Sequence, residues 1–292
     1  MSSRADVTIK RRTLRVGATT RSFIEVTPAH HADKPALVLM LHGTLQTARS
    51  IRPFAGYSFD AYARDGHAVV IYPDGLHREW NGARATVMIR SDAKKVDDVG
   101  FIRALIDHAA GNHDIDRDRV YVVGFSLGGQ MVIRLIHEIP ELLAGAAILG
   151  AVLPNDKHLV VARDAKQPLP VLTMHGTADP LAPFGGGPAG FHGHLPKGDH
   201  LSAADTAAYF ARRNAIVTRP AATTVLRARV TRYDYSAAGA APVRFYAING
   251  GGHVIPNPNH RPAQWFWGPT VSDVVAAEAI AEFFDLPALA RS

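Results

Sequence analysis

A serine between glycines, in Gly124-Phe125-Ser126-Leu127-Gly128, follows the apolar run Val120 to Val123 directly. That run is β-branched and aromatic, which favours a short buried strand. Apolar residues then recur at helical spacing until a proline ends the pattern: Met131, Leu135, Ile136, Ile139 and Pro140. A strand, a tight turn and a helix expose the hydroxyl at the apex, and the two glycines avoid clashes across the turn. Ser126 is therefore the candidate nucleophile for acyl transfer through a covalent ester.

Short apolar runs recur along the first half of the chain without polar alternation, as in strands that helices cover on both faces. They are Ala36 to Leu41, Ala68 to Tyr72, Val120 to Val123, Ala144 to Leu149 and Val171 to Met174. Helical patterns separate them, such as Val99 to Ala110 behind Asp97-Asp98, whose carboxylates can cap the first free amides. Each parallel strand pair needs such a crossover, so the order predicts a doubly wound, mostly parallel sheet.

The two ends of the chain extend this pattern. Val7 to Val16 and Arg21 to Val26 alternate polar and apolar residues across Gly17-Ala18, which predicts an antiparallel hairpin at the sheet edge. Further predicted elements are a helix over Ala203 to Ala215, strands over Val225 to Tyr235 and Val243 to Ile248, and a closing helix over Ser272 to Phe284. No linker or repeat divides the 292 residues, so we expect one α/β domain over 1–292.

Composition excludes several classes of protein. The longest apolar run, Leu142 to Leu153, is too short to cross a bilayer, and no apolar signal core follows Met1. Localisation therefore stays open: we expect a cytoplasmic protein from the chain as written, and a secreted or periplasmic one if a signal was removed. With no cysteine there is neither a disulfide framework nor a thiolate metal site. The net charge of +6 is scattered except for Lys10-Arg11-Arg12, and no nucleic-acid recognition motif is present.

A serine nucleophile needs a base that a carboxylate orients. Asp179 lies just beyond the predicted strand Val171 to Met174, where an α/β sheet places its working residues. His253 follows the predicted strand Val243 to Ile248 and three glycines that free the backbone to aim one side chain. The chain order of serine, aspartate and histidine is the order of α/β-hydrolases. Ser126, Asp179 and His253 are therefore the candidate catalytic residues.

The oxyanion that forms on attack needs two N–H donors. One usually comes from the residue after the nucleophile, here Leu127, and the other from a loop after an earlier strand. Thr44 is our choice for the second donor, with Leu45 as the alternative, because Leu41-His42-Gly43 ends a buried strand.

Other acids and histidines near strand ends have structural interpretations. Asp74, in Tyr72-Pro73-Asp74-Gly75, is the nearest rival acid, and we expect a turn residue there. His42 and His175 each precede a glycine after a strand, and we expect both to bond loop backbone instead of transferring protons.

Together these residues resemble the polyhydroxybutyrate depolymerase family of esterases, a group that also contains feruloyl and acetylxylan esterases. The matching segments are Leu41-His42-Gly43, Tyr72-Pro73-Asp74-Gly75, Trp80-Asn81, Asp97-Asp98-Val99-Gly100-Phe101, Gly124-Phe125-Ser126-Leu127-Gly128-Gly129, His175-Gly176-Thr177-Ala178-Asp179-Pro180 and Gly250-Gly251-Gly252-His253. The resemblance covers nearly the whole chain. It implies an α/β-hydrolase fold, ester hydrolysis without metal or cofactor, and the triad named above. Secreted members often have a cysteine near the second oxyanion position, where this chain has Thr44.

The substrate wall is less constrained. Several aromatic residues lie in loops that flank the proposed acid and base, and one more lies in Trp80-Asn81-Gly82. These side chains could line an apolar groove or fill the core. They are Trp80, Phe184, Phe191, Trp265, Phe266 and Trp267. The Gly/Pro-rich loop over 180–198 could act as a lid, although its glycines also fit a surface excursion.

The chain is interpreted as a serine carboxylic-ester hydrolase for polyhydroxybutyrate-type polyester or short hydroxyalkanoate esters. A feruloyl or acetylxylan esterase is the alternative. A serine peptidase or a noncatalytic hydrolase-like binding module is the weaker hypothesis, because a binding module has no need of the full triad. The partner expected is an ester or polyester, without nucleic acid or membrane insertion, and the oligomeric state stays open.

Overall fold

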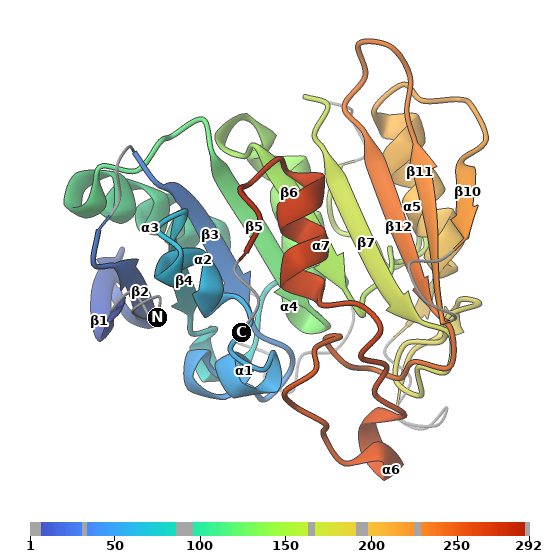
Figure 1. The fold of residues 1–292 in the computed structure, drawn as a ribbon, viewed down its shortest axis with the longest axis horizontal. Coiled ribbons are helices and arrows are strands. Elements are labelled where there is room, and N and C mark those ends of the chain that lie inside the picture. Colours follow the sequence, from blue (N-terminus) through green and yellow to red (C-terminus); the bar gives the residue numbers. More distant parts are fainter. Residues whose placement is uncertain are drawn as a thin grey trace, which may run out of the picture.

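Ten strands form one twisted sheet whose order is β1-β2-β4-β3-β5-β6-β7-β12-β11-β10 (Figure 1). The computed structural model describes residues 7–30, 34–85, 96–162, 167–190, 198–224 and 229–289. The six central strands, from β4 to β12 in this order, run parallel. Antiparallel pairing extends the sheet at both edges, through β2 and β1 on one side and β11 and β10 on the other.

The elements of this part of the chain have the following bounds. The strands are β1 (Val7–Val16), β2 (Thr19–Pro28), β3 (Ala36–Leu41), β4 (Ala68–Pro73), β5 (Val120–Phe125), β6 (Gly145–Leu149), β7 (Val171–Gly176), β8 (Gly187–Pro188), β9 (Asp199–His200), β10 (Ala221–Thr224), β11 (Val230–Tyr235) and β12 (Val243–Ile248). The helices are α1 (Ala48–Phe54), α2 (Asp60–Arg64), α3 (Asp98–His113), α4 (Leu127–Glu138), α5 (Ala203–Arg213), α6 (Gln264–Trp267) and α7 (Ala276–Phe283), with 3-10 turns at η1 (Leu76–Arg78) and η3 (Pro140–Leu142). Strands β8 and β9 form a separate two-stranded sheet.

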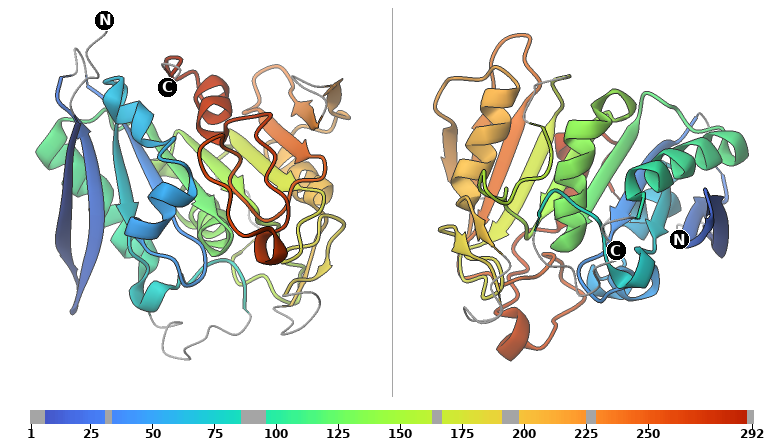
Figure 2. Two further views of the ribbon diagram at one scale, coloured as in Figure 1. Left: turned by 60° about the horizontal axis from the view of Figure 1, so that its bottom comes forward. Right: turned by 180° about the vertical axis from the view of Figure 1, so that it is seen from behind.

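The central strands are buried on both faces. In β3, Leu37, Leu39 and Leu41 belong to one hydrophobic cluster, while Val38 and Met40 belong to the other. Helices α3, α4 and α5 cover the first face, and α1, α2 and α7 cover the second (Figures 1 and 2). Burial on both faces explains why these strands have continuous apolar runs, because neither set of side chains meets water.

The doubly wound sheet with an N-terminal antiparallel hairpin is confirmed. Val16 pairs with Thr19, so the turn falls on the two residues between them, as the sequence indicates. Helix α3 begins where its carboxylates predict, because Asp97 accepts a hydrogen bond from the amide of Gly100 at 2.7 Å.

The structure differs from the sequence prediction at three places. One strand was expected over Val225 to Tyr235. In the structure β11 begins at Val230 and pairs with a separate antiparallel strand, β10, while residues 225–228 lie outside the described residues. The closing helix α7 begins at Ala276, four residues after Ser272. Helices α1 and α2 were not predicted because they are short, although α1 has a capping box formed by Thr47 and Ser50.

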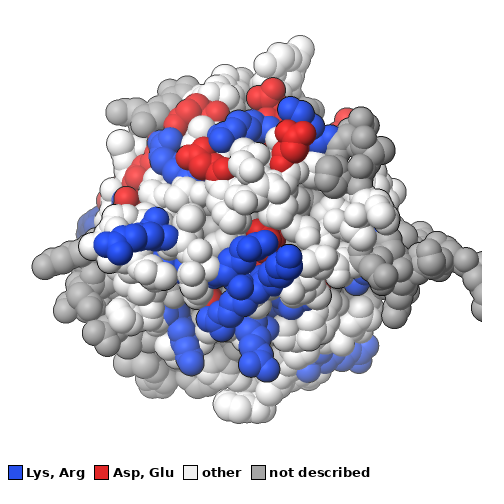
Figure 3. Space-filling view, turned by 90° about the vertical axis from the view of Figure 1, so that its left-hand side faces the viewer, with Lys and Arg blue, Asp and Glu red and all other residues white. Residues whose placement is uncertain are grey.

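The basic segment that stands out in the sequence lies on β1 at the sheet edge. Figure 3 faces this side of the molecule, where Lys and Arg side chains gather on the lower half and mix with acidic side chains near the upper edge. Two of the β1 arginines have partners: Arg11 lies 3.3 Å from Asp74, and Arg12 lies 2.7 Å from Glu25. Part of this positive charge is therefore neutralised within the fold.

Among the residues described, none of the helices combines the length and the apolar character that a membrane span requires.

Candidate active site

Ser126 lies between the end of β5 and the start of α4. Its φ of 53° and ψ of −115° fall in a region that residues with a side chain seldom adopt. Two backbone hydrogen bonds hold this conformation: the amide of Ser126 donates to the carbonyl of Leu149 at 2.8 Å, and the amide of Gln130 donates to the carbonyl of Ser126 at 3.1 Å. Strained backbone held in this way is concentrated at functional positions.

The glycines on both sides of Ser126 are required by close backbone packing. A Cβ atom on Gly124 would collide with the carbonyl of Gly128, and a Cβ atom on Gly128 would collide with the carbonyl of Leu41. The helix can therefore start directly above the strands only because these positions lack side chains. This is the steric reason that the sequence pattern suggests.

Asp179 and His253 come from loops that follow the neighbouring parallel strands β7 and β12. Both are buried, and Nδ1 of His253 lies 2.6 Å from Oδ2 of Asp179. The other carboxylate oxygen accepts the amides of Leu181 and Ala182, each at 2.8 Å. Because an ionised carboxylate can only accept, Nδ1 of His253 donates, and its Nε2 is free to take a proton.

The charge state of Asp179 follows from these contacts. Burial on its own would raise the pKa of Asp179, but the charge of His253 and the hydrogen bond from it lower that pKa below its usual value, with a smaller contribution from His175. The carboxylate is therefore ionised at neutral pH and can stabilise a positive charge on His253.

Ser126 and His253 line one cavity of about 470 Å³ at the carboxyl ends of the central strands. The ring of His253 stacks on Trp267, with centroids 5.9 Å apart and an interplanar angle of 4°, and lies 4.9 Å from the ring of Phe125. The amide of His253 also donates to the carbonyl of Trp267 at 2.6 Å. The histidine is thus fixed in orientation by an aromatic surface and a carboxylate.

The two expected oxyanion donors also line this cavity. Leu127 is the first residue of α4, so its amide lies at the positive end of a twelve-residue helix. In the earlier loop, Gly43 donates to the side chain of Gln46 at 2.8 Å and Leu45 donates to the carbonyl of Arg78 at 3.1 Å. Within the described residues the amide of Thr44 has no such partner, which favours Thr44 over Leu45 as the second donor.

His42 and His175 hold loops, as expected. His42 donates through Nδ1 to the carbonyl of Gly43 at 2.7 Å and accepts the amide of Gly75 at Nε2, at 2.9 Å. Burial lowers the pKa of His42 to about 4, so it is neutral at pH 7. His175 lies with Nε2 2.7 Å from the carbonyl of Ala182, and burial lowers its pKa as well.

Asp74 also has a structural role. It accepts the amide of Ala48 at the start of α1 and the hydroxyl of Ser22, each at 2.7 Å. Asp74 therefore fastens the turn after β4 to a helix start and to the hairpin.

The structure separates the aromatic candidates. Trp267 and Phe266 line the cavity. Trp80 instead is fully buried in the core, so it cannot touch a substrate. Its Nε1 donates to the carbonyl of His42 at 3.0 Å, which supports the loop that contains Thr44. The sequence could not distinguish a core position from a cavity wall for Trp80, because an indole beside a turn is compatible with both.

Two other aromatic candidates also lie away from the cavity lining. Phe184 is half-buried and packs between the rings of His175 and Phe245, at 6.2 and 6.0 Å. Trp265 is 77% exposed and is not part of the cavity wall. Phe191 lies outside the described residues. In the loop over 180–198, Leu181, Ala182, Ala189 and Gly190 line the cavity, so the described part of the proposed lid forms a wall.

Sequence reasoning missed the polar part of the wall. Arg84, Gln130 and His200 line the cavity with Ser126, and Nη1 of Arg84 lies 3.4 Å from Nε2 of His200. Nothing in the local pattern around Arg84 distinguishes it from the other arginines of the chain. Its position depends on contacts with residues that are distant in sequence.

A second group of histidines lies between the hairpin and α3. Nε2 atoms of His108 and His113 lie 3.0 and 2.8 Å from one carboxylate oxygen of Glu25. These are metal-ligand types, and the three atoms lie within 4.8 Å of one another. Arg12 occupies the other oxygen of Glu25 at 2.7 Å, so we interpret this group as a buried salt-bridge cluster. It shares no residue with the catalytic cavity.

One relative among known proteins matches nearly the full length of this chain. The chain is 31% identical over 299 residues to "Putative esterase NocK" of Nocardia uniformis subsp. tsuyamanensis, covering 96% of this chain and 83% of the relative. The chain belongs to the carboxylesterase family of α/β-hydrolases. A family model described as Phospholipase/Carboxylesterase matches residues 84–190, which include Ser126 and Asp179. This esterase is therefore an enzyme that hydrolyses carboxylic esters.

Shorter matches carry more specific names. The esterase is 28% identical to "Probable feruloyl esterase C" of Aspergillus niger over 47% of this chain and 44% of the relative. It is 31% identical to the poly(3-hydroxybutyrate) depolymerase of Ralstonia pickettii over 41% of this chain and 26% of the relative. Among solved structures, the acetyl xylan esterase from Aspergillus awamori covers 94% of this chain and 99% of its own, with a TM-score of 0.62 and 14% identity, which supports the fold.

Proposed function

We propose that this esterase works through an acyl-enzyme on Ser126 and that its substrates are polyhydroxybutyrate-type polyester or short hydroxyalkanoate esters. The observation that carries the proposal is a serine at positive φ that shares one cavity with a histidine bonded to a buried aspartate. Each of the three side chains follows a central strand, so the parallel sheet itself brings them to one edge.

In the proposed mechanism, Oγ of Ser126 attacks the ester carbonyl while Nε2 of His253 takes its proton. Asp179 holds the Nδ1–H tautomer and stabilises the imidazolium. The amides of Leu127 and Thr44 bind the oxyanion. The tetrahedral intermediate then collapses, His253 gives the proton to the leaving alcohol, and the acyl-enzyme remains. Water, activated by His253, attacks this ester, and collapse of the second intermediate releases the acid and restores Ser126.

The direct test compares the wild type with Ser126→Ala on p-nitrophenyl butyrate, beside a turbidity assay on amorphous polyhydroxybutyrate. Clearing of the polymer that depends on Ser126 supports the depolymerase assignment. Turnover of the small ester alone shifts the substrate to short esters. Undiminished ester turnover by Ser126→Ala would contradict the acyl-enzyme mechanism.

A feruloyl or acetylxylan esterase is the second candidate, favoured by the names of the matched relatives. Comparing kcat/KM for a feruloyl ester with that for a hydroxybutyrate oligomer separates the two. A chromogenic peptide amide tests peptidase activity in the same assay, since the same triad cleaves amides.

A further inference from the structure

The catalytic cavity contains a cation that has no carboxylate partner among the described residues. Arg84 lines the cavity together with Ser126 and His253. Its one contact with a side chain in the described part of the chain is Nη1 to Nε2 of His200, at 3.4 Å. The remaining guanidinium nitrogens have no hydrogen-bond partner among the described residues. A half-buried guanidinium of this kind is electrostatically unfavourable unless an anion approaches it.

Three other partly buried arginines of the described chain have partners. Arg52 lies 2.7 Å from Asp60, and Arg134 lies 2.7 Å from Glu138. Arg213 has no carboxylate but donates to two backbone carbonyls, each at 2.9 Å. Each of these three guanidinium groups is thus held by a carboxylate or by two backbone carbonyls, whereas Arg84 has only the contact with His200 among the described residues.

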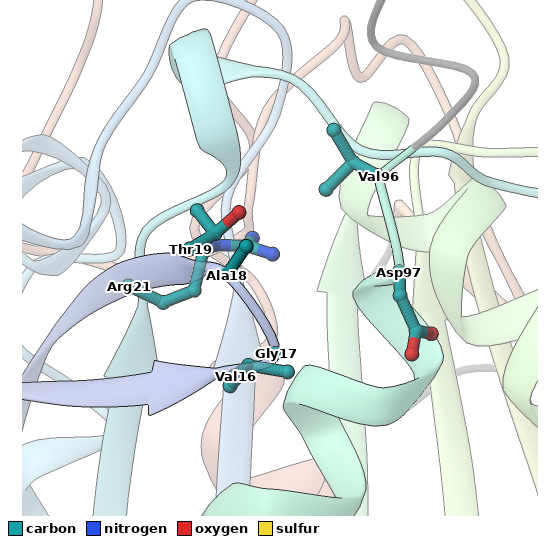
Figure 4. A pocket seen from close by; sticks show the side chains of 7 residues that line it. All are labelled: Val16, Gly17, Ala18, Thr19, Arg21, Val96 and Asp97. Atoms are coloured by element: carbon teal, nitrogen blue, oxygen red, sulfur yellow. The ribbon is translucent and has the colours of Figure 1, made fainter.

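A second cavity provides a direct comparison. A cavity of about 270 Å³ lies at the turn of the hairpin, and Thr19 and Arg21 line it together with Val96 and Asp97 before α3 (Figure 4). Its arginine is already neutralised, because Arg21 lies 2.7 Å from Asp98 and both side chains are buried. A cationic residue in a cavity wall thus does not by itself indicate a ligand, and what distinguishes Arg84 is that it lacks a carboxylate partner among the described residues and shares its cavity with Ser126 and His253.

Backbone contacts fix the position of residue 84, and this restricts where its guanidinium can lie. Residue 84 forms a β-bridge with Leu159, and the amide of Ala85 donates to the carbonyl of His158 at 2.6 Å. The amide of Ala83 donates to the carbonyl of Gln130 at 2.9 Å, which fixes the segment to α4, the helix that follows Ser126.

His200 orients the guanidinium without adding charge. It is buried and pairs with Gly187 across the β8–β9 sheet. Burial and the positive charge of Arg84 lower the pKa of His200 to about 4, so the imidazole is neutral at pH 7 and accepts from Arg84. Burial also lowers the pKa of Arg84 to about 10, and its guanidinium is still charged at pH 7. One net positive charge therefore faces the cavity.

We propose that Arg84 forms a carboxylate-binding subsite of the catalytic cavity, and that the preferred substrates are esters bearing a free carboxylate. A single guanidinium matches the charge and the planar geometry of a carboxylate, whereas a phosphate dianion would leave charge uncompensated. The cavity of about 470 Å³ has the size of a small-molecule site, so one ligand can reach Ser126 and Arg84 together. The inference rests on the proposed function, and it favours short acidic esters over a neutral polymer chain.

The test uses two matched substrate pairs, each a carboxylate and its carboxamide. One pair has the group on the alcohol side, 3-butyryloxybutyrate and 3-butyryloxybutyramide. The other has it on the acyl side, the mono-p-nitrophenyl ester of glutarate and that of glutaramate. We expect the wild type to prefer the carboxylate in one pair by tenfold or more in kcat/KM, and that pair identifies the side. In Arg84→Gln this ratio should fall by about 10- to 100-fold, because a charge-assisted hydrogen bond is lost.

Two further variants act as controls. Arg84→Lys keeps the charge but loses the planar fork, so an intermediate ratio is expected, and its thermal unfolding checks the fold if Arg84→Gln is unstable. Arg213→Gln removes a partly buried arginine outside the cavity and should leave the ratio at the wild-type value. A wild type without carboxylate preference in either pair, or an equal loss for acid and amide in Arg84→Gln, would overturn the subsite.

Binding separates this inference from the proposed function. On the Ser126→Ala background, the affinity for 3-butyryloxybutyrate and for mono-p-nitrophenyl glutarate is measured by calorimetry with and without Arg84→Gln. A loss of tenfold or more for the preferred acid supports the subsite even if Ser126 proves not to be the nucleophile. Equal affinities for both would contradict the subsite while leaving ester hydrolysis intact.

Discussion

Two imidazole–carboxylate groups lie in this molecule and have different surroundings. Asp179 with His253 lies at the carboxyl end of the sheet, and Glu25 with His108 and His113 lies between the hairpin and α3. In both groups the carboxylate is buried and contacts with imidazoles lower its pKa. A list of hydrogen bonds alone would not tell them apart.

The two groups differ in what the imidazole rings face besides the carboxylate. His253 faces a cavity that it shares with a strained serine. At Glu25 both histidines point their Nε2 atoms at the same carboxylate oxygen, and Arg12 occupies the other. His253 also gives one nitrogen to a carboxylate, but its ring lines a cavity together with Ser126, whereas neither His108 nor His113 lines that cavity. A paired histidine therefore indicates catalysis only where its second nitrogen meets a nucleophile.

The largest expected effect comes from Asp179→Asn. Loss of the carboxylate allows the wrong tautomer of His253, so kcat for p-nitrophenyl butyrate should fall by about 10³- to 10⁴-fold. Steady-state kinetics with active-site titration measures it, and circular dichroism checks that the fold is retained. A decrease smaller than tenfold would remove Asp179 from the triad.

Glu25→Gln should show the opposite profile. We expect kcat/KM to stay within about threefold of the wild type, while the free energy of unfolding at pH 7 falls by about 3 kcal/mol because Arg12 and two histidines lose their common anion. Urea unfolding beside the esterase assay measures both quantities. An activity loss as large as that of Asp179→Asn would mean that the two groups are functionally equivalent.

The pH dependence of stability sharpens the same comparison. Burial alone would raise the pKa of Glu25, but contacts with His113, Arg12 and His108 lower it from 4.5 to about 2 in the folded protein. The stabilisation is therefore present above the unfolded pKa and is lost as the pH falls through the folded one. Between pH 5 and pH 3 the wild type should lose about 2 kcal/mol more than Glu25→Gln. Parallel curves for the two proteins over this window would refute the assignment.

The smallest effects concern the aromatic wall. Trp267→Ala removes the ring on which His253 stacks, and we expect about a fivefold loss in kcat/KM, since such ring contacts contribute about 1 kcal/mol. Trp265→Ala changes an exposed side chain outside the cavity, and less than a twofold change is expected. Kinetics of the two variants side by side provides the measurement, and equal losses would mean that Trp265 also contacts substrate.

Local sequence patterns determined the loops that carry the proposed chemistry. The strand, the turn between glycines and the helix around Ser126 follow largely from neighbouring residues, because the backbone collision at Gly124 arises within that turn. The collision at Gly128 instead involves Leu41 of the neighbouring strand β3. The positions of Asp179 and His253 followed from strand ends, since a parallel sheet gathers its carboxyl ends on one edge. The unpredicted strand β10 and the short helices α1 and α2 lack such strong local patterns.

Only the tertiary structure decided which residues form the cavity wall. Trp80 is buried and Trp267 faces the site, although the sequence pattern predicted loop positions for both. Arg84 and His200 lie 116 positions apart and meet only because the bridge to Leu159 and the β8–β9 sheet place them there. Whether a side chain lines a cavity, and whether its charge is neutralised, depends on partners that are remote in sequence. Periodicity and turn chemistry report on neighbours, so they fix the positions of the catalytic loops and leave the specificity of this esterase to packing.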